Sequence, residues 1–269
     1  MDKRKDVKNL MIFVNPTGRF FSSAVDNETD VLVKVQIDNS LDLGWKKEDI
    51  LLITNFDYEY GGVKAMVVGG ENYCGFSPTA TKINAIIYLF EQGVIGKDLY
   101  WFHDFDAFQL GWITEREIEL GDMDFGLTEY GRTTMNARRD KRLSTGSVFF
   151  RKSARDIFEW IKIKVYQYEC NEEVALLELT KIPKYTLKDR IKRLNITYNF
   201  ATRKRDISES FEIALKPLKV IHFHPFDRRP LDREGNNNNM DVCVYGRNRL
   251  NKVLASEGLI EIFNKHGIV

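Results

Sequence analysis

The sequence predicts an α/β fold. Continuous apolar runs alternate with amphipathic segments between residues 10 and 103, which is the pattern of buried strands connected by helices. The chain has 269 residues, of which 43% are hydrophobic, so it can bury one substantial core. We therefore expect a single domain over residues 1–269 with a variable C-terminal part.

The first segments predict a strand–helix–strand beginning. Residues 10–14 are a continuous apolar run that ends at a turn sequence, which indicates the first buried strand. Near-helical spacing of apolar residues favours a helix within residues 29–43, and the apolar run at 49–55 predicts a second buried strand. A third, short strand is expected at 64–68.

A helix follows Ser77, which suits an N-cap, with Pro78 at its first position. Gly93 is expected to end this segment before the next strand, at 99–102. Its buried face is predicted from apolar residues at the i, i+3, i+4 and i+7 positions, which are Ile83, Ile86, Ile87 and Phe90.

The second half of the chain is less regular. Residues 111–142 are polar and have no stable period, which predicts a long functional excursion or a small helical insert. The remaining expected elements are strands at 147–150 and 218–223, helices at 154–168 and 172–179, a flexible loop at 235–239, and a final helix within 247–265 as a C-terminal extension.

Composition excludes several classes of protein. Forty basic and 39 acidic residues give a net charge of +1, so the whole-molecule charge does not favour nucleic acid or an anionic membrane. Cys74, Cys170 and Cys243 are far apart and lack CxxC spacing, which argues against a disulfide framework or a zinc knuckle. The charged N-terminus and the absence of an apolar run of about 18 residues favour a soluble cytoplasmic protein with no membrane span.

Two carboxylates follow the apolar run at 99–102. In extended backbone, Asp104 and Asp106 would point to the same face and Phe105 to the other, so two anionic oxygens can approach one divalent cation. The carboxyl end of a buried strand is also where open α/β sheets bind ligands. The alternative is a solvated acidic loop, since the sequence contains a second such triplet at 122–124.

Four short segments occur in an order that resembles the GT-A fold glycosyltransferases that use nucleotide sugars, in particular the glycogenin and galactosyltransferase-like group. The resemblance extends over roughly residues 8–230. The segments are Tyr100-Trp101-Phe102-His103-Asp104-Phe105-Asp106, Ser144-Thr145-Gly146-Ser147-Val148-Phe149-Phe150, Asn171-Glu172-Glu173, and Val220-Ile221-His222-Phe223-His224-Pro225. The second and third differ from the usual Asn-x-Gly and Asp-Gln of the family, and Arg229-Pro230 stands where the family has Lys-Pro.

This resemblance implies a Rossmann-like mixed sheet of GT-A type, flanked by helices, and metal-dependent transfer of a sugar from a nucleotide diphosphate to a hydroxyl acceptor. It implies a donor such as a UDP-sugar, with a nucleotide-binding half at about 1–106, an acceptor and sugar half at about 107–230, and a C-terminal loop and helix at 231–269. The implied metal ligands are Asp104, Asp106 and either His222 or His224. Ser144, Thr145 and Gly146 would lie beneath the donor sugar, Glu172 or Glu173 beside its anomeric carbon, and Arg229 at the diphosphate.

An imidazole ligand favours Mn²⁺ over Mg²⁺, because nitrogen ligands suit transition metals. For His222 the alternative is a buried histidine with satisfied hydrogen bonds at the end of a sheet. Lys82, early in the helix after Ser77, either contacts a phosphate or ribose or is a solvated surface lysine.

The loops after the first two strands are expected to lie where an α/β sheet accepts a nucleoside. Asn15 and Thr17 follow the first strand, and Asn55 and Asp57 follow the second. Their amide, hydroxyl and carboxylate groups suit base and ribose contacts. The alternative is local turn chemistry, for which Asn and Asp are common.

Basic residues cluster in two stretches, which predict either a solvated basic face or a surface for an anionic acceptor. The expected partners are therefore a nucleotide-sugar donor and a glycan, protein or modified nucleic acid acceptor. The basic residues are Arg138, Arg139, Lys141 and Arg142 in one stretch, and Lys184, Lys188, Arg190, Lys192, Arg193, Arg203, Lys204 and Arg205 in the other.

Two rival functions use the same residues. A metal-dependent phosphoesterase or nuclease would employ the paired carboxylates on a phosphate ester. A non-catalytic binding or assembly protein would keep a glycosyltransferase-like scaffold without its activity. For a transferase, both retention and inversion of the anomeric configuration are compatible with Glu172 or Glu173 as the catalytic carboxylate.

Overall fold

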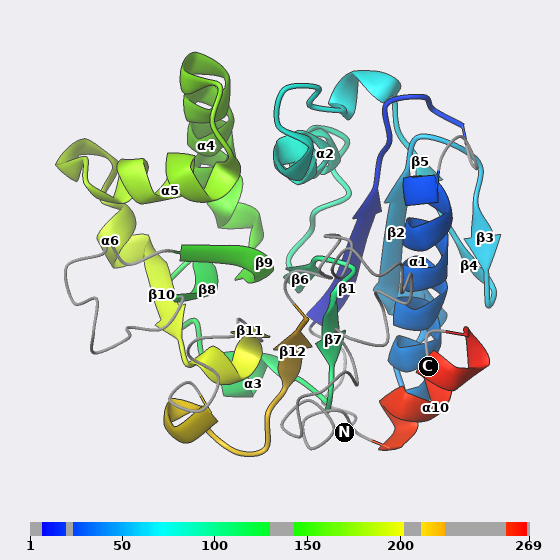
Figure 1. Cartoon of the computed structure of the whole chain (residues 1–269). Helices are drawn as coiled ribbons and strands as arrows, with labels where there is room; N and C mark the ends of the chain where they lie inside the picture. The colour runs from blue at the N-terminus through cyan, green and yellow to red at the C-terminus, as the bar shows by residue number, and fades with distance from the viewer. Residues whose placement is uncertain (1–6, 20–23, 130–142, 202–210, 224–256, 268–269) are drawn as a thin grey trace, which may run out of the picture.

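The computed structural model describes residues 7–19, 24–129, 143–201, 211–223 and 257–267, and its centre is a mixed seven-stranded sheet (Figure 1). The strands are β1 (Val7–Phe13), β2 (Ile50–Thr54), β5 (Met66–Val67), β6 (Leu99–His103), β8 (Phe125–Glu129), β9 (Leu143–Phe150) and β10 (Ile191–Leu194). They are ordered β10-β8-β9-β6-β1-β2-β5. β9 is antiparallel to both β6 and β8, whereas all other neighbours are parallel. The predicted α/β class is confirmed.

Helices cover both faces of this sheet. The longer ones are α1 (Ala24–Asp42), α2 (Thr81–Glu91), α4 (Arg155–Tyr168) and α5 (Glu172–Thr180), and the short ones are α3 (Glu115–Ile118) and α6 (Leu187–Arg190). Side chains alternate along each strand, so one face of β1 and β6 packs Leu10 and Phe102 against α2, α4 and α5. The other face packs Met11 and Trp101 against α1. The core is therefore divided into two layers by the sheet.

A second, three-stranded sheet lies beside the first and carries part of the site. It consists of β7 (Ala107–Gln109), β11 (Phe200–Ala201) and β12 (Val220–His222), in the order β11-β12-β7. β12 is antiparallel to β7, with His222 opposite Ala107. Because β7 begins three residues after Asp104, this pairing brings the end of β12 to the carboxyl end of β6.

The C-terminal helix α10 (Glu257–Lys265) packs against the N-terminal helix α1 (Figure 1). Phe263 is fully buried in an apolar cluster with Phe108 and Phe223 of the three-stranded sheet region. Lys265 and His266 both contact the Asp38 carboxylate of α1, at 2.7 Å each. The expected C-terminal helical extension is confirmed, and it holds α1 and the small sheet together.

The structure corrects several expected elements. Residues 111–129 are no simple excursion, since they contain α3 and the sheet strand β8, while 130–142 lie outside the described residues. The short strands β3 (Glu59–Tyr60) and β4 (Val63–Lys64) form a hairpin, so only β5 remains of the strand expected at 64–68. Ser77 makes no capping hydrogen bond, because Pro78–Ala80 forms a 3₁₀ turn and α2 begins at Thr81.

The boundaries of the later elements also differ from expectation. β9 begins at Leu143, earlier than the expected strand at 147–150, and β10 was not expected at all. The loop expected at 235–239 and the start of the final helix, 247–256, lie outside the described residues. Cys74 and Cys170 are free thiols. Among the described helices, none has both the length and the apolar character that crossing a membrane requires.

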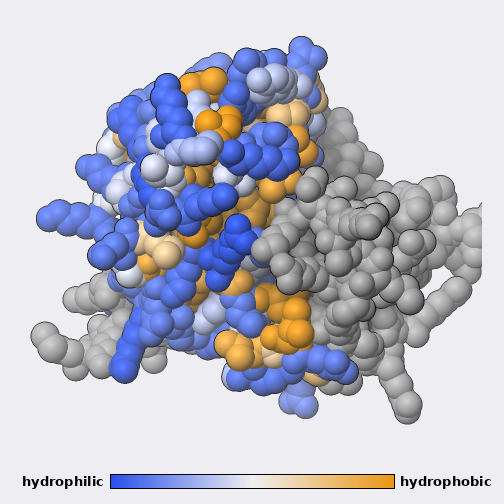
Figure 2. All heavy atoms as spheres, turned by 90° about the vertical axis from the view of Figure 1, so that its left-hand side faces the viewer, coloured by the Kyte–Doolittle hydropathy of each residue, from blue (hydrophilic) through white to orange (hydrophobic). Residues whose placement is uncertain are grey.

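Figure 2 shows the face of the molecule that carries α4, α5 and α6, where hydrophilic side chains predominate. Several of the predicted basic residues on these elements make intramolecular contacts. Arg190 pairs with Asp124 and Asp156 at 2.6 Å each, and Arg193 pairs with Glu129 at 2.6 Å. Lys184 and Lys188 are exposed, whereas 138–142 and 203–205 lie outside the described residues. The described part of the basic stretch is thus partly neutralised within the protein.

Candidate active site

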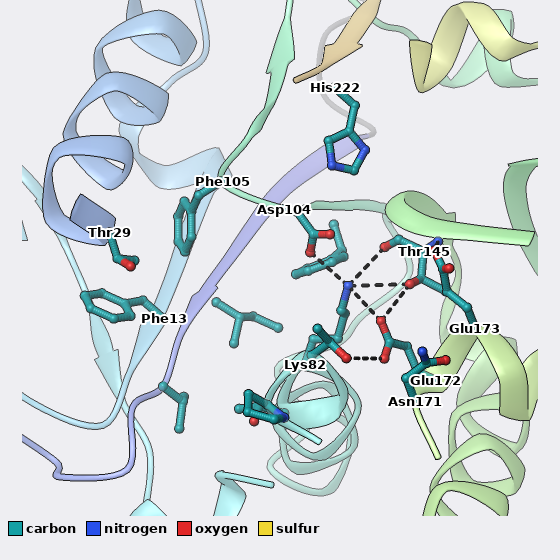
Figure 3. A pocket seen from close by; sticks show the side chains of 16 residues that line it. Phe13, Thr29, Lys82, Asp104, Phe105, Thr145, Asn171, Glu172, Glu173 and His222 are labelled. Atoms are coloured by element: carbon teal, nitrogen blue, oxygen red, sulfur yellow. Dashed lines mark hydrogen bonds and ion pairs between the residues drawn. The ribbon is translucent and has the colours of Figure 1, made fainter. Parts of the chain in front are cut away.

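A pocket of about 430 Å³ lies at the carboxyl ends of β1 and β6, between α1 on one side and α2 and α5 on the other (Figure 3). Its wall near α1 is mostly apolar and includes Phe13 and Phe105. Its opposite wall carries charged and polar side chains from α2, β9 and α5. Of the residues expected to form a site, Lys82, Asp104, Thr145, Glu172, Glu173 and His222 line this pocket.

Asp104 and His222, which line the pocket, converge with Asp106, which is not among the lining residues. Each offers one ligand atom, and these three atoms lie within 4.8 Å of one another, close enough to hold one metal ion. Nε2 of His222 is 3.1 Å from Oδ1 of Asp106. These side chains come from the end of β6, the following turn and the end of β12. The sequence predicted this convergence across more than 100 residues, and the structure brings the three side chains together.

The local geometry of the two aspartates differs from expectation. Residues 104–106 form a turn, closed by the Ala107 N–H donating to the Asp104 carbonyl at 3.0 Å, and β6 ends at His103. The two carboxylates therefore approach one another through the turn and not through strand alternation. Phe105 was expected to pack on the opposite face, but it lines the pocket, with its ring centre 6.3 Å from that of Phe13.

Gly146 is required by the close approach of two of these side chains. A Cβ placed on Gly146 would meet the His222 ring, at 2.8 Å from Nδ1, and would lie 3.1 Å from Oδ2 of Asp104. The Gly146 carbonyl also accepts a hydrogen bond of 2.9 Å from the Asp104 N–H. Only a residue without a side chain leaves room for both groups, so this glycine within β9 shapes the cluster of Asp104, Asp106 and His222.

Lys82 is a buried ammonium group at the centre of the polar wall. The residue is only 8% exposed, so its interpretation as a solvated lysine is wrong. Its Nζ lies 2.8 Å from Oδ1 of Asp104 and 3.2 Å from Oε1 of Glu172 (Figure 3). Burial lowers the pKa of Lys82, but the Asp104 and Glu172 carboxylates outweigh burial and raise it above its ordinary value. The pocket therefore contains a permanent positive charge.

Glu172 and Glu173 open α5 after the N-cap Asn171, whose side chain accepts from the Val174 N–H at 2.9 Å. Both are acidic residues in the first turn of the helix, where they suit the helix dipole, and both also face the pocket. Glu172 is 3% exposed, and its two oxygens accept from the hydroxyls of Thr145 and Thr79 at 2.9 Å each. Burial raises the pKa of Glu172, but Lys82 and these hydroxyls lower it by more. The net pKa of Glu172 therefore lies below its ordinary value.

Glu173 has a different environment from Glu172. Its Oε1 accepts from the Thr145 N–H at 3.1 Å, and the residue is only half-buried. Burial raises the pKa of Glu173, and the nearby carboxylates of Glu172 and Asp104 raise it further, while Thr145 and Lys82 oppose the shift. Of the two glutamates, Glu173 thus has the higher pKa.

Two buried histidines near the pocket have opposite pKa shifts. Burial lowers the pKa of His222, but the facing Asp106 carboxylate outweighs burial and gives a net increase. Burial lowers the pKa of His103 to about 4, so this ring is neutral. Sequence reasoning did not single out His103, because its contact with Asn9, 94 residues away, is visible only in the fold.

The four residues expected at a nucleoside lie outside the pocket lining. The Asn55 side chain hydrogen-bonds to the Asn15 backbone, with Asn55 Nδ2 donating to the Asn15 carbonyl at 2.7 Å and the Asn15 N–H donating to Asn55 Oδ1 at 3.1 Å. The Asn15 side chain also accepts from the backbone N–H groups of Thr17 and Gly18. These contacts are the turn chemistry that the structural alternative expected. Asp57 is exposed on the following turn.

Ser144 also lies away from the pocket, fully buried, and its hydroxyl accepts from Asn199 Nδ2 at 2.7 Å. His224 and Arg229 lie outside the described residues. The apolar wall was not anticipated as part of the site, although the position of Phe13 at the end of the first predicted strand was a usable signal. The unanticipated lining residues are Ile12, Phe13, Val14, Thr29, Pro78, Thr79, Thr81, Phe102, Phe105 and Asn171.

Comparison with solved structures identifies the fold. The galactosyltransferase LgtC, solved in complex with donor and acceptor sugar analogues, matches with a TM-score of 0.50 and 13% identity over 80% of this chain and 86% of LgtC. A glycosyltransferase involved in glycosylation of the major capsid of PBCV-1 matches with a TM-score of 0.52 and 11% identity, over 81% of this chain and 94% of its own length. This chain has the GT-A glycosyltransferase fold.

The GT-A fold accounts for nearly the whole described chain. The glycosyltransferase GlyE of Streptococcus pneumoniae matches with a TM-score of 0.52 and 12% identity over 98% of this chain, which spans 64% of GlyE. No protein-family model and no curated protein matches the sequence. The short segments that resembled GT-A enzymes were thus sufficient to identify the fold where overall sequence similarity is very low.

Proposed function

We propose that this protein is a metal-dependent glycosyltransferase that moves a sugar from a nucleotide diphosphate donor to a hydroxyl acceptor. The observation that carries this proposal is the convergence of Asp104, Asp106 and His222 beside a pocket in a GT-A fold. Solved structures of similar fold are glycosyltransferases, one of them bound to donor and acceptor sugar analogues. We infer that the donor is a UDP-sugar from the resemblance of the sequence motifs to the family.

The metal cluster fits a divalent ion by its donor atoms and by its shape. Two carboxylates and one imidazole suit Mn²⁺ better than Mg²⁺, because Mg²⁺ prefers oxygen ligands alone. Gly146 leaves the space in which Asp104 and His222 face each other. When bound, the ion supplies positive charge that stabilises the diphosphate leaving group as the glycosidic bond breaks.

The two walls of the pocket suggest how the donor lies. The apolar wall around Phe13 and Phe105 suits the flat faces of a nucleobase. The polar wall, with the Lys82 ammonium at its centre, suits the diphosphate and the sugar. Thr145 and Gly146 would then lie beneath the sugar, and Arg229 would contact the diphosphate as the family resemblance implies. Ser144 would support this part of β9 from beneath, since its hydroxyl contacts Asn199.

Glu172 and Glu173 have different proposed roles. Glu172 holds Lys82 and the hydroxyls of Thr79 and Thr145, so it positions the polar wall. Glu173 faces the pocket with a raised pKa, which suits a group that contacts the sugar or accepts a proton from the acceptor hydroxyl. The acceptor is proposed to be a glycan, a protein or a modified nucleic acid.

The test is a screen for nucleotide-sugar hydrolysis in the absence of acceptor, with Mn²⁺, with Mg²⁺ and with EDTA. We expect release of one nucleotide diphosphate with Mn²⁺ and its loss in Asp104→Asn and Asp106→Asn variants that remain folded. The matched control is Asp122→Asn, which changes an exposed aspartate in the other Asp-x-Asp triplet. Phosphate release from simple esters without a sugar donor would instead identify a phosphoesterase, and no hydrolysis of any donor would contradict the proposal.

A further inference from the structure

His222 belongs to a buried chain of three side chains that runs away from the pocket. Its Nδ1 is 3.0 Å from Oδ1 of Asn199, and Asn199 Nδ2 donates to Ser144 Oγ at 2.7 Å. Ser144 and Asn199 are 0% and 1% exposed. The proposed donor chemistry uses neither Asn199 nor the Ser144 hydroxyl directly. Their position behind the histidine therefore points to a role that acts through His222.

The orientation of the Asn199 amide favours the tautomer of His222 that carries the proton on Nδ1. The amide oxygen of Asn199 faces Nδ1 and can only accept, so this contact is a hydrogen bond when Nδ1 carries the proton. Nε2 faces Asp106 and the metal cluster. An imidazole can bind a metal only through a nitrogen with a free lone pair, and a ring protonated on Nδ1 offers that lone pair on Nε2. Nδ1 and Cε1 of the ring pack against Gly146, so rotation of the ring by 180° would disturb this close contact.

A second chain of the same composition provides an internal comparison. Nε2 of His103 is 2.9 Å from Oδ1 of Asn9, and Asn9 Nδ2 donates to Ser40 Oγ at 3.0 Å. The Ser40 hydroxyl donates to the Gln36 carbonyl at 2.7 Å, so its oxygen accepts from Asn9 and fixes that amide. Here asparagine engages Nε2 of the histidine, whereas at His222 asparagine engages Nδ1. Nδ1 of His103 is also 3.2 Å from the Asp104 carbonyl oxygen, so both of its ring nitrogens face acceptors and Asn9 does not by itself decide the His103 tautomer.

We propose that Asn199, held by Ser144, is a positioning residue that keeps the proton of His222 on Nδ1 and so reserves Nε2 for the metal ion. The consequence for metal affinity rests on the metal site proposed above, whereas the tautomer of His222 is independent of it. Asn199 contacts neither the donor nor the metal. It acts only through the orientation and protonation of one ligand.

The tautomer can be measured directly in the metal-free protein. Two-bond ¹H–¹⁵N spectra distinguish protonated from unprotonated ring nitrogens, and the chain has four histidines, so the spectrum is simple to assign with single histidine variants. In alkaline buffer, where the rings are neutral, we expect His222 as the Nδ1–H form. In Asn199→Leu, the Nδ1–H preference of His222 should disappear, while His103 is unchanged.

The second measurement is the affinity for Mn²⁺ alone, from the electron paramagnetic resonance signal of the free ion. Asn199→Leu should weaken Mn²⁺ binding about 10–100-fold, the usual effect of losing a hydrogen-bond partner behind a metal ligand. Asn199→Asp keeps an oxygen opposite Nδ1 and should retain affinity close to the parent. Asn9→Leu is the matched control, because it removes the same type of buried asparagine from the other histidine and should leave Mn²⁺ affinity unchanged.

Each outcome supports or overturns the proposal. Loss of the Nδ1–H form and of Mn²⁺ affinity in Asn199→Leu, with rescue by Asn199→Asp, supports it. An Asn199→Leu protein that keeps the Nδ1–H form, or that binds Mn²⁺ as tightly as the parent, overturns it. If the parent binds no Mn²⁺, the proposed metal dependence fails, but the ¹⁵N spectra still decide whether Asn199 sets the tautomer.

Discussion

At the residue scale, the candidate site is an arrangement of buried charges that depend on one another. Lys82 lies between Asp104 and Glu172, and Gly146 makes space for Asp104 beside His222. Isolated buried charges are unfavourable, so each group is stable only while its partners are present. The sequence predicted Asp104, Asp106 and His222 from motif order. It gave no signal that Lys82 is buried, because burial depends on β9 and α5, which are distant in sequence.

Replacing Lys82 by methionine should destabilise the protein by about 3 kcal/mol at neutral pH, because the buried Glu172 carboxylate and the partly exposed Asp104 carboxylate lose their partner. The pH dependence should also reverse. In the parent, the pKa of Glu172 lies below the ordinary 4.5. The contribution of Glu172 to the free energy of unfolding is therefore present at neutral pH and is lost as the pH falls below 4.5 and through the lowered pKa. In Lys82→Met, unopposed burial raises the carboxylate pKa values, so the destabilisation should decrease as the pH falls.

Urea denaturation of the Lys82 variant at several pH values measures both effects. The control is Lys97→Met, which removes an exposed lysine in the turn after α2. If Lys82→Met lowers the free energy of unfolding no more than the control does, the ion pairs with Asp104 and Glu172 contribute little to stability.

Replacing Gly146 by alanine should affect both stability and metal binding. The added methyl group would push against the His222 ring and Asp104, and overpacking of this kind costs about 1–3 kcal/mol. Because it displaces two proposed ligands, Mn²⁺ affinity should fall as well, as calorimetric titration can measure. Gly75→Ala is the control, since a Cβ there meets no atom within 4 Å among the described residues. Equal Mn²⁺ affinities for the two variants would refute the steric role of Gly146.

At the element scale, the site depends on where strands end. β6 delivers Asp104, the turn to β7 delivers Asp106, and pairing of β12 with β7 delivers His222. β1, β2 and β6 could be predicted because buried parallel strands are continuous apolar runs. β8 and β10 could not, because β8 contains Gly126 and β10 is an edge strand with Lys192 and Arg193 in its centre. Their stability comes from pairing, which a local pattern does not reveal.

The attachment of α10 to α1 combines apolar packing with ion pairs to the largely buried Asp38, and the packing should dominate. Phe263→Ala should destabilise the protein by about 3–5 kcal/mol, because the ring is fully buried. Asp38→Asn should cost about 1 kcal/mol or less, since its partner Lys265 is mostly exposed. Denaturation of both variants, with hydrogen exchange of residues 257–267, measures the difference.

The acid sensitivity of this attachment follows from Asp38. Burial raises the pKa of Asp38, but Lys265, His266 and Tyr60 outweigh burial and lower it below the ordinary 3.8. Its contribution is therefore complete at neutral pH and is lost as the pH falls below 3.8. Faster hydrogen exchange of α10 in Asp38→Asn than in Phe263→Ala would contradict this ranking.

At the scale of the whole molecule, the GT-A fold brings together segments that are separated by most of the chain. The class of fold and the order of the motifs were predictable, because buried strands and short ligand motifs are local. The two-walled shape of the pocket was not, because its apolar wall combines Phe13, Thr29 and Phe105 from three different elements. The contact between Asn199 and His222 was likewise not predictable, because the two residues are 23 positions apart in the sequence.

The most direct test of the central claim is calorimetric titration of UDP into the protein with and without Mn²⁺, repeated with a folded Asp104→Asn variant. The account predicts saturable UDP binding by the parent with Mn²⁺, and much weaker binding when Mn²⁺ is omitted or Asp104 is replaced. UDP binding of equal strength in the absence of Mn²⁺, or in Asp104→Asn with Mn²⁺ present, would contradict the claim that this carboxylate holds the metal ion that binds the donor.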